Sequence, residues 1–191
     1  MTFNSTFFII ILCLISAAVA YDGIKARDYA IAHCDKKNHN TAYPTFKDDS
    51  TNFASQILEA GGIPQSAEWY CHKPCNKNYW REMTLGSSCY KGYEFTKSWS
   101  TVNDLYNYLI KNEFARVCDL KDLKPGDLIQ YNKKKFNKKK WAYDYWHHTS
   151  VVIEQSPTNP KLVDHSTDRC DADHAHAMKA DNDFRPLCIG H

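Results

Sequence analysis

Seven cysteines behind an uncharged, apolar leader limit the fold of this chain more than any other feature of its sequence. Residues 1–20 carry no charge, hold an apolar core from Phe7 to Ile15, and end in Ala-Val-Ala. This pattern is typical of a secretory signal peptide that is removed after Ala20; an uncleaved membrane anchor is the alternative. We therefore expect a secreted or extracellular protein, or one in the lumen of the secretory or endolysosomal system, where disulfides form readily.

Cys13 leaves with the leader, and the cysteines that remain are odd in number, so at least one thiol is free or pairs with another chain. They are Cys34, Cys71, Cys75, Cys89, Cys118, Cys170 and Cys188. Disulfides are the favoured interpretation, although the sequence does not define which cysteines pair. The Cys71-x-x-x-Cys75 spacing also suggests zinc, but no second ligand pair lies at a matching spacing. We expect no metal and no cofactor.

Residues 21–191 have the length of one domain with a core of its own. The formal net charge of +2 indicates no particular partner. We expect no nucleic-acid partner, no membrane partner once the leader is removed, and a monomer.

Capping residues and apolar spacing predict three helices. Asp22 caps the first helix. The second begins with Asp49 or Ser50 as its N-cap and ends at the Gly61-Gly62 pair. The third covers roughly residues 101–115. The expected inner faces of the first two helices consist of Ile24, Ala26, Tyr29, Ala30 and Ala32, and of Phe53, Ala54, Ile57 and Leu58.

Three strands are predicted in the second half of the chain. A turn at Pro125-Gly126 leads into a strand that begins at Leu128. Residues 149–154 and 161–167 are rich in β-branched and apolar residues and read as a pair of strands joined by a proline-bearing turn.

The remaining segments are predicted to be irregular. We expect residues 65–98, rich in cysteine and aromatics, to form a long disulfide-pinned loop over the start of the second helix. The lysine-rich residues 133–140 are predicted to be a solvated loop, with attraction to an anionic polymer such as a bacterial wall as the second interpretation. The tail, residues 168–191, is polar, and its Asp-His-Ala-His-Ala run is more typical of a solvated loop than of a metal site.

Ser50 is the first candidate for chemistry because it lies at the expected start of the second helix. A helix N-terminus carries unpaired N–H groups and a partial positive charge. These groups can lower the pKa of a nucleophile and hold a developing oxyanion. The simpler alternative is that Ser50 only caps the helix.

Two histidines on the predicted strand pair are the second candidates. If residue 154 lies opposite residue 161 in an antiparallel pair, His148 and His165 become diagonal neighbours on one face. One of them can then act as a base while the other orients it. A slip of one residue would exchange the roles of His147 and His148.

The chain resembles the putative amidase domain family, which is similar to the NlpC-type, papain-like cell-wall peptidases. The resemblance covers residues 21 to about 168, nearly everything after the leader. The segments that carry it, in order, are "YDGIKARDYA", "AYPTFKDDSTNFASQILEAGGIP", "SWSTVNDLYNYL", "LKPGDLIQY", "HHTSVVIE" and "LVDHSTD". It implies an α+β fold, with N-terminal helices packed on a small antiparallel sheet, and hydrolysis of amide bonds in peptidoglycan-like or peptide substrates.

The resemblance also implies roles for individual residues. The family carries a nucleophilic cysteine directly before Thr-Asn-Phe, and in this chain that position is Ser50. The base corresponds to His148 and the third catalytic residue to His165. We further expect three residues to contact substrate: Asn52, Trp69 and Trp99.

Serine in place of cysteine leaves two functions open. A thiol has a pKa of about 8.5, and a helix terminus lowers it further. An alcohol is far more basic, and a helix terminus supplies only about 0.3–2 kcal/mol. Ser50 therefore needs a closely placed base. The chain is either a hydrolase that uses Ser50 with His148 and His165, or an inactive relative that binds cell-wall or peptide ligands. Cys34 as nucleophile is a weaker third possibility, because the C-terminus of a helix raises a thiol pKa.

Overall fold

The computed structural model describes residues 20–75, 87–136, 142–179, 181 and 183–190, so all of the predicted leader except Ala20 lies outside the described residues. The helices and short helical turns are α1 (Gly23–His33), η1 (Lys36–Asn38), α2 (Ser50–Ala60), α4 (Lys97–Ser100), α5 (Val102–Lys111), η2 (Leu120–Asp122) and α6 (His174–Ala177). The strands are β1 (Cys71–His72), β2 (Ser87–Tyr90), β3 (Tyr93–Thr96), β4 (Ala115–Val117), β5 (Leu128–Phe136), β6 (Ala142–Glu154), β7 (Lys161–Asp164), β8 (Arg169–Asp173) and β9 (Asp183–Ile189).

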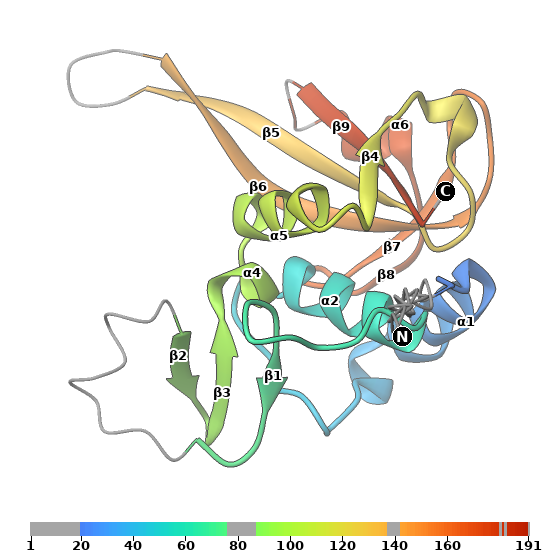
Figure 1. Cartoon of the computed structure of the whole chain (residues 1–191). Helices are drawn as coiled ribbons and strands as arrows, with labels where there is room; N and C mark the ends of the chain where they lie inside the picture. The colour runs from blue at the N-terminus through green and yellow to red at the C-terminus, as the bar shows by residue number, and fades with distance from the viewer. Residues whose placement is uncertain (1–19, 76–86, 137–141, 180, 182, 191) are drawn as a thin grey trace, which may run out of the picture.

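The strands form two antiparallel sheets. The larger one has six strands in the order β4-β9-β5-β6-β7-β8, and the smaller one has three in the order β1-β3-β2. Helices α1, α2 and α5 all contact β6, the long strand in the middle of the large sheet. Figure 1 shows α2 between the large sheet and the small one. The predicted α+β class is therefore confirmed.

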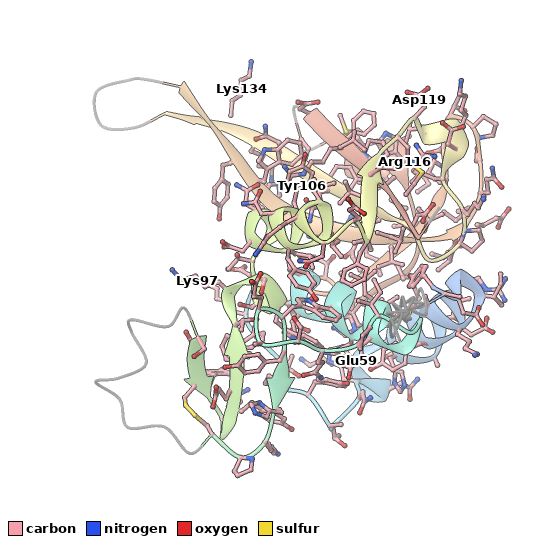
Figure 2. All side chains as sticks on the ribbon, in the orientation of Figure 1. Glu59, Lys97, Tyr106, Arg116, Asp119 and Lys134 are labelled. Carbon is pink, nitrogen blue, oxygen red and sulfur yellow. A yellow bond between two sulfur atoms is a disulfide. The ribbon has the colours of Figure 1, made fainter. Side chains whose placement is uncertain are left out.

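Both faces of the large sheet are covered, and the alternation of side chains along its strands explains how. In β5, Leu128 packs with the helices in one core while Ile129 joins a second core on the opposite face. In β6, Val151 and Val152 divide in the same way. All four side chains are at most 1% exposed, and Figure 2 shows side chains on both faces of the sheet. The helical face is the one that carries α2 and its N-terminus.

The first helix is capped as predicted, but its inner face is narrower. Asp22 Oδ1 accepts hydrogen bonds from the backbone N–H groups of Ile24 and Lys25, at 3.1 and 3.0 Å. Only Ala26 and Ala30 are buried in α1. Ile24, expected inside, is 50% exposed.

The third helix ends earlier than predicted. α5 stops at Lys111, and Glu113 adopts a left-handed backbone conformation with φ of 57°. The chain then enters β4 at Ala115, which pairs with Ile189 of β9. The predicted helix therefore extends too far, since its last residue, Ala115, belongs to an edge strand.

The segments predicted to be irregular contain most of the structural surprises. Within residues 65–98, the small sheet and α4 replace much of the expected loop. Lysine-rich residues 133–136 continue β5, and Lys134 lies on the hairpin that projects from the sheet in Figure 2; residues 137–141 lie outside the described residues. The polar tail forms β8, α6 and β9, and β9 inserts between β4 and β5. The prediction of an irregular tail was wrong. β8 pairs with the adjacent strand β7, and β9 pairs with β4 and β5, which lie far away in the sequence.

Gly61 lies against Tyr21, and its replacement tests how much this packing contributes to stability. A Cβ at Gly61 would lie 2.3 Å from Cε2 of Tyr21 and 3.0 Å from Cβ of Ala26. Its φ of −73° suits alanine, so only the clash opposes substitution. We expect Gly61→Ala to lower the free energy of unfolding by about 1–3 kcal/mol through overpacking, measured by urea unfolding.

A double-mutant cycle is the control for this prediction. In a Tyr21→Ala background the closer contact is gone and the contact with Ala26 at 3.0 Å remains, so the further change Gly61→Ala should lower the urea midpoint much less. An equal loss in both backgrounds would show that the ring of Tyr21 is not the cause.

Candidate active site

Ser50 opens α2, a helix whose first nine residues are all buried. Its N-cap, Asp49, does not use its side chain to cap the helix. Instead Asp49 Oδ1 accepts hydrogen bonds from the backbone N–H of Phe46 at 2.7 Å and from Nδ2 of Asn52 at 2.9 Å. Within the described part of the chain, no acceptor is found for the backbone N–H of Ser50 or Thr51. The positive end of α2 therefore keeps free donors beside the Ser50 hydroxyl.

The side chain of Ser50 lies against β6. The backbone N–H of Thr149 donates to Ser50 Oγ at 3.3 Å, and the hydroxyl oxygens of Thr51 and Thr149 are also 3.3 Å apart. Thr149 directly follows His148 in β6, so the residue that contacts Ser50 is the sequence neighbour of the candidate base. Among the described residues, no hydrogen bond joins Ser50 to the ring of His148.

His148 has a carboxylate partner, and that partner is Asp164. Nε2 of His148 lies 3.3 Å from Asp164 Oδ2. The carboxylate is 2% exposed and is held by two hydroxyls: Ser150 donates to Oδ2 at 3.4 Å and Thr167 donates to Oδ1 at 3.3 Å. The contact is at ion-pair distance and lacks hydrogen-bond geometry. Among the described residues, no partner is found for the other ring nitrogen, Nδ1.

A β-bulge explains why Asp164 occupies the position predicted for His165. The expected pairing of Glu154 with Lys161 is present, but Val152 then pairs with Leu162. One extra residue of β6, at position 153, shifts the register by one. The residue diagonal to His148 is therefore 164 and not 165. No local pattern in the sequence predicts this bulge.

The structure places His165 in a buried contact of its own. Its Nδ1 lies 2.8 Å from Asp49 Oδ2 and its Nε2 lies 2.9 Å from the carbonyl oxygen of His33. The ring stacks between Phe53, at 3.5 Å, and His39, at 3.9 Å. Both ring nitrogens are occupied, so the expected contact between His165 and His148 is not formed.

His147 does not contact Ser50, His148 or Asp164 through its described hydrogen bonds. It is the extra residue at a second bulge, where Tyr131 pairs with His148 and Asn132 pairs with Trp146. Its Nε2 lies 2.6 Å from Asp181 Oδ1. Burial lowers the pKa of His147, and the hydrogen bond with Asp181 opposes that shift. The exchange of His147 for His148 that a register slip would produce has not occurred.

The three residues expected to contact substrate are core residues instead. Asn52, Trp69 and Trp99 are each 0% exposed. Nε1 of Trp99 donates to Asn52 Oδ1 at 2.8 Å, and Nε1 of Trp69 donates to Ser55 Oγ at 3.1 Å. Their polar atoms are satisfied inside the protein, so the expectation of substrate contact was wrong.

Among the cysteines that the structure describes, six are paired and one is free. The disulfides join Cys34 to Cys170, Cys75 to Cys89, and Cys118 to Cys188. Cys71 is free and 3% exposed, and burial, with a smaller contribution from Glu59, raises its pKa to about 12. The disulfides remove Cys75 as a zinc ligand and Cys34 as a nucleophile. They are typical of extracellular proteins. None of the described helices combines the length and apolar character needed to cross a membrane.

One cluster has metal-ligand residue types, but its geometry does not suit a metal. Ligand atoms of His39, His165 and Asp168 lie within 4.8 Å of one another. The rings of His39 and His165 are stacked with an interplanar angle of 24°, so their in-plane lone pairs cannot converge on one ion. In the tail, His174 is 5% exposed and its Nδ1 lies 3.0 Å from the hydroxyl of Tyr131, which leaves that histidine in the core.

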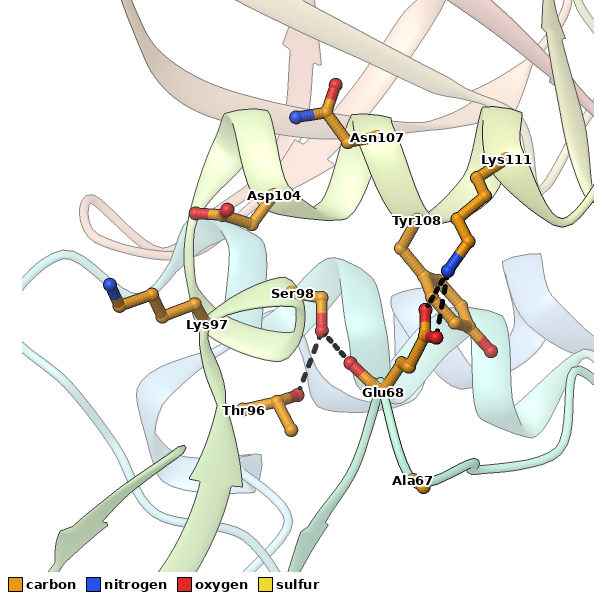
Figure 3. Close-up of a pocket in the computed structure, with 9 residues that line it drawn as sticks. All are labelled: Ala67, Glu68, Thr96, Lys97, Ser98, Asp104, Asn107, Tyr108 and Lys111. Carbon is orange, nitrogen blue, oxygen red and sulfur yellow. Dashed lines mark hydrogen bonds and ion pairs between the residues drawn. The ribbon is translucent and has the colours of Figure 1, made fainter. Parts of the chain in front are cut away.

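A hollow on the molecular surface lies apart from Ser50. Its volume is about 370 Å³, and Figure 3 shows its lining residues, which come from the end of β3, from α4 and α5, and from the segment around Glu68. Lys111 Nζ pairs with Glu68 at 2.8 Å across it. Neither Ser50 nor His148 nor Asp164 lines this hollow, so we do not assign it to the candidate active site.

Comparisons with known proteins identify a family and two relatives of this chain. The sequence profile of a family described as "putative amidase domain" matches residues 20–185. The uncharacterized protein YhbB of Bacillus subtilis (strain 168) is 29% identical over 157 residues, which cover 78% of this chain and 42% of that protein. The uncharacterized protein YjcM of the same organism is 27% identical over 154 residues, covering 78% of this chain and 32% of its own length. This chain thus spans less than half of either relative. No solved structure matches it.

Proposed function

Because this chain belongs to the putative amidase domain family, we propose that it hydrolyses an amide bond with Ser50 as nucleophile, His148 as base and Asp164 as the residue that orients the base. The contact between His148 Nε2 and Asp164 Oδ2, at 3.3 Å, is the observation that supports this most. A buried carboxylate held by two hydroxyls has a fixed direction. It fixes the imidazole tautomer and stabilises the imidazolium that forms when the base takes a proton.

The proposed reaction begins with attack of Ser50 Oγ on the amide carbonyl carbon while His148 Nδ1 takes the hydroxyl proton. The N–H groups of Ser50 and Thr51 stabilise the oxyanion. His148 then gives the proton to the leaving nitrogen, the C–N bond breaks, and the acyl group remains on Ser50 as an ester. Water, activated by the same imidazole, hydrolyses the ester and restores the serine.

Proton transfer to His148 is the step that allows a serine to act as the nucleophile. Each pKa unit corresponds to about 1.36 kcal/mol, so the positive end of α2 alone cannot ionise an alcohol. The backbone N–H of Thr149, 3.3 Å from Ser50 Oγ, adds one hydrogen-bond donor to the oxygen as it loses its proton. Removal of the proton by His148 during the attack avoids a free alkoxide.

We propose an NlpC-type, papain-like arrangement and peptidoglycan-like or peptide substrates, reached by secretion. The arrangement is supported by a candidate nucleophile at the N-terminus of α2 and a candidate base on β6. Secretion is supported by the three disulfides and the apolar leader.

An inactive ligand-binding protein is the second candidate function. Two observations favour it: Ser50 is only 4% exposed, and no hydrogen bond joins it to His148 among the described residues. In such a protein, the free N–H groups at the start of α2 would hold a carbonyl or carboxylate of the ligand without cleaving it.

The test is release of new amino groups from peptidoglycan and from a peptide amide by the purified protein. We expect release by the wild type and its loss, by about 10³-fold or more, in Ser50→Ala. Ser55→Ala removes a buried hydroxyl from the same helix and serves as the control for folding. Release that persists in Ser50→Ala excludes Ser50 as nucleophile. No release by the wild type but release by Ser50→Cys supports the binding protein.

A further inference from the structure

We propose that His165 and Asp49 form a positioning pair, which holds the first turn of α2 and thereby sets where the Ser50 side chain lies relative to His148. Neither residue touches the proposed reacting atoms. The inference rests on the proposed role of Ser50, and it gives the buried histidine a purpose other than orienting the base.

The hydrogen bonds of His165 define how the pair must be protonated. The carbonyl oxygen of His33 can only accept, so Nε2 of His165, 2.9 Å away, carries a proton. Nδ1 lies 2.8 Å from Asp49 Oδ2, and this contact also needs a proton between the two atoms. His165 thus donates at both nitrogens, or shares its second proton with the carboxylic acid of Asp49. The side chains are 3% and 4% exposed, so water does not replace a lost partner.

Asp49 is held from several directions. Its second carboxylate oxygen, Oδ1, accepts from the backbone N–H of Phe46 and from Asn52 Nδ2. Its own backbone N–H donates to Ser166 Oγ at 2.9 Å. Because Asp49 directly precedes Ser50, a shift of Asp49 moves the backbone from which the nucleophile projects.

The turn that follows β7 links both halves of the proposed site. Asp164, at its start, contacts His148, and the next two residues, His165 and Ser166, contact Asp49. Figure 1 shows β7 and β8 close to α2. One short segment therefore holds the base on one side and the nucleophile-bearing helix on the other. This shared support is the reason to expect an effect on reactivity and not only on stability.

The surroundings of His165 limit how it can move. Its ring is parallel to Phe53, with an interplanar angle of 1°, and it stacks on His39. The titratable groups that face it are Asp49, His39 and, through His39 Nε2 at 3.2 Å, Asp168. His39 contacts the same ring without a hydrogen bond to Asp49, so it provides a matched control.

The experiment uses Ser50→Cys as a reporter, because a thiol can be titrated without a substrate. The rate of alkylation by iodoacetamide is measured against pH, and the modified peptide is identified by mass spectrometry. Cys71, the free thiol of the described residues, is 3% exposed and has a pKa raised to about 12, so it reacts slowly. We expect the thiol at position 50 to have a pKa below the usual value of about 8.5.

Changes to the pair should then alter the titration of that thiol. Adding His165→Ala or Asp49→Asn to Ser50→Cys is expected to slow alkylation at pH 7 by about tenfold, equal to a pKa rise of about one unit. His165→Gln keeps one donor and is expected to restore part of the rate. Adding His39→Gln should leave the profile unchanged. If His165→Ala does not fold, the comparison of Asp49→Asn, His165→Gln and His39→Gln decides the same question.

Failure of the positioning role and failure of the proposed function give different results in this experiment. Identical low-pKa profiles with and without His165→Ala or Asp49→Asn, in folded protein, overturn the positioning role and leave the proposed function intact. An equal rise in the thiol pKa with His39→Gln also overturns the positioning role. Loosening the stacked rings of His39 and His165 would then be enough to change the thiol, without loss of the hydrogen bond to Asp49. A parent Ser50→Cys thiol with an ordinary pKa argues against the proposed nucleophile itself.

Discussion

Asp164→Asn is expected to lower kcat/KM for the amide substrate by about 10⁴-fold while the protein remains folded. An asparagine amide can donate to Nε2 of His148, and the imidazole would then carry its proton on Nδ1. In that tautomer His148 cannot take the proton of Ser50. The neutral amide also gives no charge stabilisation to the imidazolium. The measurement is steady-state hydrolysis of whichever substrate the wild type cleaves.

The matched control for this prediction is Asp168→Asn, in the same turn. Asp168 lies 3.2 Å from Nε2 of His39 and has no described contact with His148. We expect its replacement to change kcat/KM by less than about tenfold. Comparable losses in the two variants would mean that the turn as a whole matters, and the individual role of Asp164 would have to be given up.

Much of the fold could be predicted because its signals are local. The cap at Asp22, the start of α2 at Ser50 and the turn at Pro125-Gly126 each depend on residues adjacent in sequence. What escaped prediction is nonlocal. β9 is polar at its start, and nothing in its own residues indicates that it will insert between β4 and β5.

In the candidate site, too, the local features were predicted and the nonlocal ones were missed. Ser50 and the His148 segment were predicted to meet, and Thr149, next to His148, does contact Ser50. The partner of the base was missed by one position because a bulge is decided by packing between strands and not by the strand sequence. One available signal was that Asp164 is the only acidic residue in the predicted strand 161–167.

The residues expected to contact substrate were misassigned for a different reason. Asn52, Trp69 and Trp99 are polar or amphipathic, and the sequence does not reveal whether their polar atoms find partners inside the protein. The structure gives each of them such a partner, and all three lie in the core. A buried polar group that is fully hydrogen-bonded is compatible with a core position, so residue type alone was a poor guide here.

Removal of the Cys34–Cys170 disulfide, by Cys34→Ser with Cys170→Ser, is expected to cause the largest loss of stability. The bond closes a sequence separation of 136 residues. In the chain-entropy account, a loop of that length contributes about 5 kcal/mol at 25 °C. For a domain of this size we expect Tm to fall by about 10–20 °C, measured by differential scanning calorimetry. Cys34 also follows His33, whose carbonyl accepts from His165, so the same change loosens one contact of the positioning pair.

The matched comparison is removal of the Cys75–Cys89 disulfide in the same protein. Its sequence separation is 14, for which the same account gives about 3 kcal/mol. The longer closure should therefore lower Tm more than the shorter one. The opposite order would show that native-state contacts around each bond, and not the entropy of the unfolded chain, determine what these disulfides contribute. The two effects differ in a second way, because only the change at Cys34–Cys170 should also alter the alkylation profile of Ser50→Cys.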